Sequence, residues 1–209
     1  MNRFLVRSWA DFGIAVETGA SGVELVGDHI AGTWLATPKV VRAGSSRPVS
    51  VELLNTVECV GVDRFPEAAV KFTKKFGALT VPYSPGSPFQ FSMQDWIVSL
   101  RQLQQVWTGV SRASRRTAPI NVFVDRGEYF SFEADQLTFR TGSLETFVSL
   151  EIASVSAPRL CICANRLHGC KSPFFVADDT REKYCSEDCA RAGKRRANLN
   201  WWNENRRGK

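Results

Sequence analysis

Apolar residues recur at helical spacing in two stretches near the middle of the chain. The first stretch carries apolar residues every three or four positions, at Phe65, Ala68, Ala69, Phe72 and Phe76. Pro66 suits the first turn of a helix, and Gly77 favours its end. The pattern therefore predicts a helix over residues 65–76.

The second stretch has the longest helical pattern in the sequence. Ser92 is a suitable N-cap, and the apolar positions that follow keep the helical period for nearly five turns, at Met93, Trp96, Ile97, Leu100, Leu103, Trp107 and Val110. Three prolines between residues 82 and 88 exclude a helix just before it and predict an exposed connection. We expect a helix over residues 93–110.

Shorter segments on both sides of these helices have patterns typical of strands. Residues 3–10 and 22–35 are mixed segments punctuated by glycines, and residues 51–54 form a further short apolar run. Residues 143–155 fit a helical and an alternating pattern, and we favour a helix there. Apolar and polar residues alternate in a later region and predict a hairpin or short meander over residues 120–124, 130–134 and 137–139.

This mixture of elements predicts an α+β fold. We expect a mixed α+β domain over residues 1–157, with a role in sensing or assembly, and a small zinc-finger domain over residues 158–209. No apolar run approaches the roughly 18 residues that a membrane span needs, and the first residues lack the pattern of a secretory signal. We therefore expect a soluble, cytoplasmic protein.

Charge and cysteine are both concentrated at the C-terminal end of the chain. The protein has 209 residues and a formal charge of +6. Residues 1–158 contain 15 basic and 15 acidic residues, whereas residues 159–209 contain 12 and 6. Five of the six cysteines lie in this basic region, and only Cys59, which we interpret as a small core residue, lies outside it. Clustered cysteines in a cytoplasmic protein indicate a metal site, because thiols stay reduced there.

The spacing of these cysteines predicts one structural zinc ion, Zn2+. A tetrahedral zinc site takes four thiolates as two close pairs, and we assign the pairs to Cys163 with Cys170 and Cys185 with Cys189. Cys161 or His168 could replace Cys163, because both lie within a few residues of it. Zinc would supply folding free energy that a module of about 50 residues cannot obtain from its core alone.

The segments around the two cysteine pairs predict a treble-clef zinc finger. Residues 172–180 combine an apolar triplet with a polar turn, which favours a small hairpin between the pairs. Ser186 is a good N-cap, and the acidic residues after it suit the first turn of a helix. Knuckle, hairpin and a helix that carries the last two ligands are the parts of this finger.

These residues resemble the C-terminal zinc finger of bacterial CGNR-type proteins, which are regarded as DNA-binding transcriptional regulators. The resemblance rests on Cys163-Ala-Asn, Cys170, Phe174-Phe175-Val176 and the run from Tyr184 to Arg191, about a quarter of the chain. The segment 72–79 and the following helix look like the N-terminal domain of such proteins. The CGNR tetrapeptide is absent, because Cys189 is followed by Ala-Arg-Ala. The resemblance implies a metal-held module that binds nucleic acid.

The final helix presents two distinct faces. Small residues and Trp201 share one face, which we expect to pack. The other face contains the predicted nucleic-acid-binding residues, whose cations neutralise phosphates and whose Asn and Arg can read base edges: Arg191, Lys194, Arg195 and Asn198. Trp202 could stack on an unpaired base, although we favour a role in covering the core of the finger.

The leading hypothesis is a zinc-binding transcriptional regulator that binds double-stranded DNA. Its N-terminal domain would take a small ligand or a protein partner. The alternative is a zinc-finger module for protein–protein interaction, with the Trp201–Trp202 pair as its anchors. We do not expect an enzyme, because the chain has only two histidines, His29 and His168, and lacks the common phosphate-binding, dinucleotide and hydrolase motifs.

Overall fold

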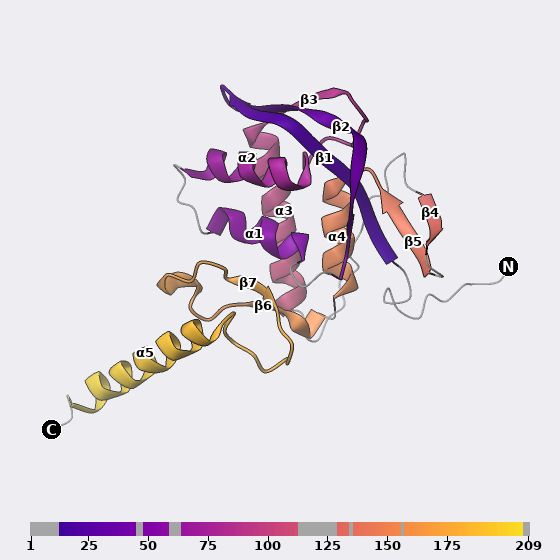
Figure 1. The fold of residues 1–209 in the computed structure, drawn as a ribbon. Coiled ribbons are helices and arrows are strands. Elements are labelled where there is room, and N and C mark those ends of the chain that lie inside the picture. Colours follow the sequence, from indigo (N-terminus) through magenta and orange to yellow (C-terminus); the bar gives the residue numbers. More distant parts are fainter. Residues whose placement is uncertain are drawn as a thin grey trace.

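A computed structural model describes residues 13–44, 48–58, 64–112, 129–133, 136–155 and 157–206. The fold is α+β, as predicted: one mixed sheet, four helices gathered beneath one of its faces, a small cysteine-rich hairpin and a final helix that extends away from the rest (Figure 1). The predicted segments 3–10 and 120–124, and Cys59, lie outside the described residues.

The sheet is built on a long antiparallel hairpin. Strands β1 (Gly13–Val26) and β2 (His29–Arg42) pair antiparallel, and Val26 and His29 form the pair next to the turn. A two-residue turn of this kind favours a residue with positive φ, and Gly27 has a φ of 62°. The predicted strand segment 22–35 is therefore two strands, because the turn falls within it.

Three shorter strands complete the sheet in the order β3-β2-β1-β5-β4. Strand β3 (Pro88–Ser92) pairs antiparallel with β2, and β5 (Gln136–Thr141) pairs parallel with β1. Strand β4 (Tyr129–Glu133) pairs antiparallel with β5, which confirms the second half of the predicted meander as a hairpin. The sheet thus contains both parallel and antiparallel pairs.

The two helices with clear apolar periods form as predicted. Helix α2 (Phe65–Phe76) buries its phenylalanines against the sheet and ends at Gly77. Helix α3 (Met93–Arg112) buries two tryptophans, Trp96 and Trp107, and the Ser92 hydroxyl accepts a hydrogen bond from the Asp95 backbone N–H at 3.0 Å. These helices supply much of the core below β1 and β2.

Two other helices flank them. Helix α4 (Leu144–Ser154) confirms the helical interpretation of this segment, with the Ser143 hydroxyl as its N-cap. The predicted strand over residues 51–54 is wrong, because this segment belongs to helix α1 (Val49–Glu58). Leu53 and Leu54 are buried on α1, and the Ser50 N–H donates to the buried Glu151 carboxylate at 2.7 Å, so α4 caps α1.

The cysteine-rich segment forms a small hairpin that leads into the last helix. Strands β6 (Leu160–Ile162) and β7 (Phe174–Val176) pair antiparallel, and α5 (Glu187–Arg206) follows. The predicted hairpin within residues 172–180 is wrong. Strand β7 pairs with β6, which precedes it in the chain, so the first cysteine pair lies in the segment between these two strands. Two 3-10 turns, Ala157–Arg159 and Arg166–His168, lie before β6 and inside the hairpin.

This hairpin is docked on the N-terminal body by polar and apolar contacts. The Asn55 amide on α1 donates to the Phe174 carbonyl at 2.8 Å, and its oxygen accepts from the Phe174 N–H at 2.9 Å. The Trp107 indole N–H donates to the Cys161 carbonyl at 3.3 Å. Leu160 and Phe174 belong to the same buried core as α1–α4, and the division into residues 1–157 and 158–209 stays a prediction.

Candidate metal centre

Four cysteine side chains converge at the base of α5, and they come from the end of β6, the turn at Gly169 and the start of α5. Cys163 lies directly after β6, and Cys170 follows Gly169, whose φ of 82° allows the chain to turn back. Cys185 precedes α5, and Cys189 lies in its first turn. The Ser186 hydroxyl accepts a hydrogen bond from the Cys189 N–H at 3.3 Å, which confirms Ser186 as the cap of this helix.

The geometry of the four thiols is compatible with one zinc ion. All four Sγ atoms lie within 4.8 Å of one another. The Sγ of Cys185 is 3.4 Å from that of Cys170 and 3.6 Å from that of Cys189. A tetrahedron with Zn–S bonds of about 2.3 Å separates its sulfurs by about 3.8 Å. The sulfurs therefore already stand close to the separations that a bound zinc ion would impose.

Without a metal, burial and crowding keep protons on these thiols, and a bound cation would displace them. Burial raises the pKa of Cys170 to about 11, against a backbone hydrogen bond from Ser172 that lowers it. Burial and the neighbouring thiols also raise the pKa of Cys185. Four thiolates cannot share so small a space without a positive charge between them, whereas a divalent cation stabilises all four. Thiolates around zinc are the chemistry that this donor set can support.

The structure resolves the alternatives at the first cysteine position. The converging group contains Cys163, which is buried, and contains neither Cys161 nor His168. Cys161 lies on β6 with its Sγ 3.8 Å from the Pro158 carbonyl, and His168 is exposed. The four cysteines predicted as ligands are thus the ones that the fold brings together.

Asn165 and Arg196 support the centre, and neither of them was assigned a role in it from the sequence. Asn165 is buried inside the knuckle, where its amide donates to the Cys189 carbonyl. Its side-chain oxygen accepts from the Arg196 guanidinium at 2.5 Å. These contacts tie the first cysteine pair to α5 and orient the second pair. An Asn two residues after a knuckle cysteine is a signal for this role, because Asn side chains favour turns.

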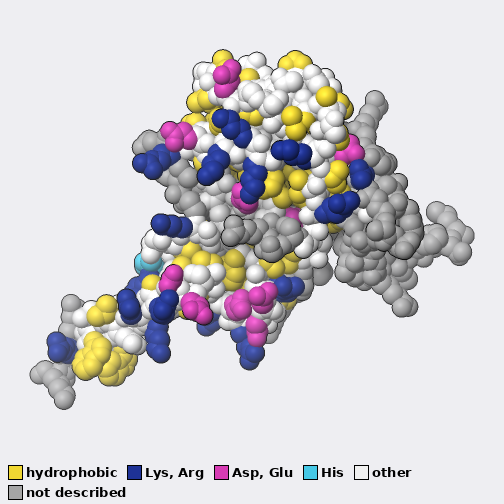
Figure 2. Space-filling model, viewed as in Figure 1, with side chains coloured by type: hydrophobic (Ala, Val, Ile, Leu, Met, Phe, Trp, Pro, Cys, Tyr) yellow, Lys and Arg dark blue, Asp and Glu magenta, His cyan; other side chains and the backbone are white. Residues whose placement is uncertain are grey.

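Helix α5 presents the predicted nucleic-acid-binding residues to solvent. Arg191, Lys194, Arg195 and Asn198 are all exposed. Arg191 forms an exposed ion pair with Asp188 at 2.6 Å. Figure 2 shows dark blue side chains around the base of α5, next to the cysteine-rich hairpin. The structure therefore places these four residues on one accessible helix and leaves their role to be tested.

The predicted packing of the far end of α5 is wrong. Gly193 is buried against the Tyr184 ring, but every residue from Ala197 to Arg206 is exposed. Trp201 and Trp202 are 57% and 55% exposed, and their rings contact each other at a centroid distance of 5.4 Å. Trp202 therefore does not cover the core of the finger. The helix leaves the finger after about two turns, so the second half has nothing to pack on.

Among the helices that the structure describes, none combines the length and the apolar composition needed to cross a bilayer. Comparisons with protein-family models, with curated proteins and with solved structures find no match for this chain. The fold and the four-cysteine centre, rather than membership of a family, are therefore the grounds for a functional proposal.

Proposed function

We propose that this protein is a zinc-binding transcriptional regulator that contacts double-stranded DNA through helix α5. The observation that supports this most is the exposure of α5 after its first turns, with its cations directed to solvent. A zinc-held base and the contact between Asn165 and Arg196 would hold the helix at a fixed angle to the finger. The N-terminal body would then sense a ligand or mediate assembly.

The dimensions of α5 suit a major groove. Its 20 residues span about 30 Å, and a helix with side chains is about as wide as the roughly 12 Å groove. Arg191, Lys194 and Arg195 would neutralise phosphates, and Asn198 would reach a base edge. Zinc with four thiolates carries a charge of about −2, so the formal +6 of the C-terminal region becomes about +4. From a charge of this size we expect moderate affinity for DNA.

Charge removal on α5 tests the proposal. We expect the triple variant R191A/K194A/R195A to lose DNA binding in fluorescence anisotropy, while the metal content stays unchanged. A matched control removes three exposed cations from the body, at Lys39, Arg64 and Arg101, and should bind DNA like the wild type. Equal binding by the two triple variants would overturn a role for α5.

A second candidate is a protein-interaction platform, favoured by the apolar end of α5. Leu199, Trp201 and Trp202 are each more than half exposed, and yellow side chains gather at this end of α5 in Figure 2. Tryptophans that are exposed in the free protein are common anchors of interfaces.

Salt dependence separates the two candidates. If the three cations of α5 each neutralise one phosphate, the logarithm of the affinity should fall with the logarithm of salt concentration at a slope of about −2.7. Docking on the tryptophan pair would change little with salt, because its driving force is burial of apolar surface.

A further inference from the structure

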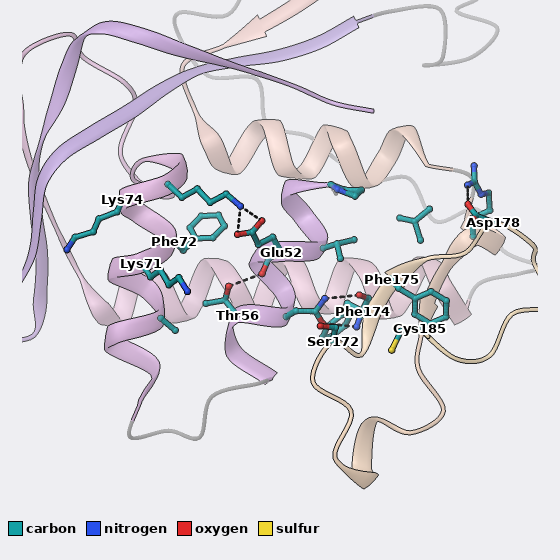
Figure 3. A pocket seen from close by; sticks show the side chains of 17 residues that line it. Glu52, Thr56, Lys71, Phe72, Lys74, Ser172, Phe174, Phe175, Asp178 and Cys185 are labelled. Carbon is teal, nitrogen blue, oxygen red and sulfur yellow. Dashed lines mark hydrogen bonds and ion pairs between the residues drawn. The ribbon is translucent and has the colours of Figure 1, made fainter. Parts of the chain in front are cut away.

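An open cleft lies beside the junction of the N-terminal body and the cysteine-rich hairpin. It has a volume of about 1090 Å³ and lies between helices α1 and α2 on one side and β7 with its flanking residues on the other (Figure 3). The docking contacts of Asn55 with Phe174 form part of its floor. Its volume is that of a site for an organic ligand rather than for a single ion.

The wall formed by α2 carries three lysines. Lys74 and Lys75 follow Lys71 by three and four residues, so each is a neighbour of Lys71 on the helix surface. Lys75 is bound by both carboxylate oxygens of Glu52, at 2.8 and 2.7 Å. Within the described part of the chain, Lys71 and Lys74 have neither an ion pair nor a hydrogen bond.

The directions of these side chains place one free ammonium inside the cleft. In Figure 3, Lys71 points from α2 toward Thr56 on α1, whereas Lys74 points outward from the rim. Arg159 adds a cation at the far end, where it donates to the Ala177 carbonyl at 2.7 Å and lies 3.7 Å from Asp178. The acidic residues that line the cleft, Glu52 and Asp178, are outnumbered two to one by its cations.

The opposite wall supplies apolar surface. Phe175 on β7 is partly exposed and lines the cleft, as does Val51 of α1. A ligand that suits both walls has several negative charges at one end and a flat apolar group at the other. Lysines bind phosphates as point charges, and aromatic rings stack on bases.

We propose that this cleft binds a small organic polyphosphate of the nucleoside triphosphate class. Its phosphates would contact Lys71 inside the cleft and lie near Lys74 at the rim, and its ring would lie against Phe175 on the hairpin. Such a ligand would bridge the body and the zinc-held finger, so its binding would stabilise their docking. This site is separate from α5 and does not depend on DNA binding by that helix.

Calorimetry on the zinc-loaded full chain tests this site with ATP as the probe. We expect ATP to bind with a dissociation constant below about 1 mM, and K71Q/K74Q to weaken it by about tenfold or more. K39Q, an exposed lysine on β2 outside the cleft, is the matched control and should bind like the wild type. No heat of binding, or equal loss in both variants, would overturn the site.

Two further probes test which part of the ligand each wall binds, and whether the cleft binds a small ligand or DNA. Inorganic tripolyphosphate should bind more weakly than ATP to the wild type, and F175A should reduce ATP affinity while leaving tripolyphosphate affinity unchanged. Equal affinities for both probes would overturn the contact with Phe175. A DNA duplex that displaces ATP, together with equal losses of DNA and ATP affinity in K71Q/K74Q, would assign the cleft to the DNA path and overturn a small-ligand site.

Discussion

Two buried polar residues connect segments that are far apart in the sequence. Asn55 exchanges two hydrogen bonds with the backbone of Phe174 and so joins the body to the hairpin. Glu151 accepts from the Ser50 N–H at the first turn of α1, and only 2% of the residue is exposed. A carboxylate at a helix N-terminus is favourable, but burial of its charge is costly.

The pKa of Glu151 predicts a specific dependence of stability on pH. Burial raises this pKa above its ordinary value of 4.5, against the hydrogen bonds from Ser50 and Val49 that lower it. The folded protein then retains a proton that the unfolded chain has lost, so stability falls as the pH rises through 4.5 toward the folded pKa. Glu151→Gln keeps an acceptor for the Ser50 N–H and removes this titration.

Urea unfolding of wild type and Glu151→Gln from about pH 4 to about pH 7 measures the effect. We expect the free energy of unfolding of the wild type, relative to that of the variant, to decrease as the pH rises. Protonation of the zinc-binding thiols acts on both proteins and cancels in the difference. Parallel curves would show that Glu151 titrates alike in the folded and unfolded states.

At the residue scale, the sequence predicts the metal centre well and its supports poorly. Four cysteines in two close pairs are sufficient to predict a tetrahedral site, because few other arrangements of thiols have that spacing. Asn165 and Arg196 are 31 positions apart, and their contact depends on the angle between the knuckle and α5. No local pattern encodes that angle.

At the scale of elements, the end of α2 depends on a conformation that only glycine adopts readily. Gly77 has a φ of 90° and a ψ of −177°. A Cβ at this position would lie 2.8 Å from the Trp34 ring and would also strike the Thr18 hydroxyl. Thr18 donates to the Phe76 carbonyl, so this junction holds the last turn of α2 against β1.

Alanine substitutions at two glycines test this junction. We expect Gly77→Ala to lower the free energy of unfolding by about 3 kcal/mol, because it adds backbone strain and a steric clash. Gly109→Ala on the exposed side of α3 is the control: its Cβ meets nothing within 4 Å, and it should stabilise the protein by about 0.5–1 kcal/mol. A Gly77→Ala variant as stable as the wild type would contradict the assigned conformation.

The helices that the sequence predicts clearly are those with one buried face. Helices α2 and α3 alternate buried and exposed positions at the helical period, which makes their pattern readable. Helix α4 is buried on several sides, at Leu144, Phe147, Val148, Leu150 and Ile152, so no single stripe marks it. Helix α1 buries the polar residues Ser50 and Asn55 through tertiary contacts, so its buried face is not marked by apolar residues alone. Only its short apolar run was visible in the sequence, and that run is also typical of a strand.

At the scale of the whole molecule, a neutral α+β body supports a cysteine-rich finger whose last helix extends freely (Figure 1). The finger shares core residues with the body through Leu160 and Phe174, but its knuckle and the base of α5 depend on the four-cysteine centre. We expect a metal ion at this centre to fix the position of α5, because without it no metal–thiolate bonds would hold the knuckle to the base of the helix.

Metal analysis of the freshly purified, reduced protein tests this account most directly. It predicts one zinc ion per chain, and it predicts that chelation raises amide hydrogen exchange across residues 158–206 while α2 and α3 stay protected. A reduced sample that contains no zinc, or a chelated sample whose finger exchanges as slowly as before, would contradict it.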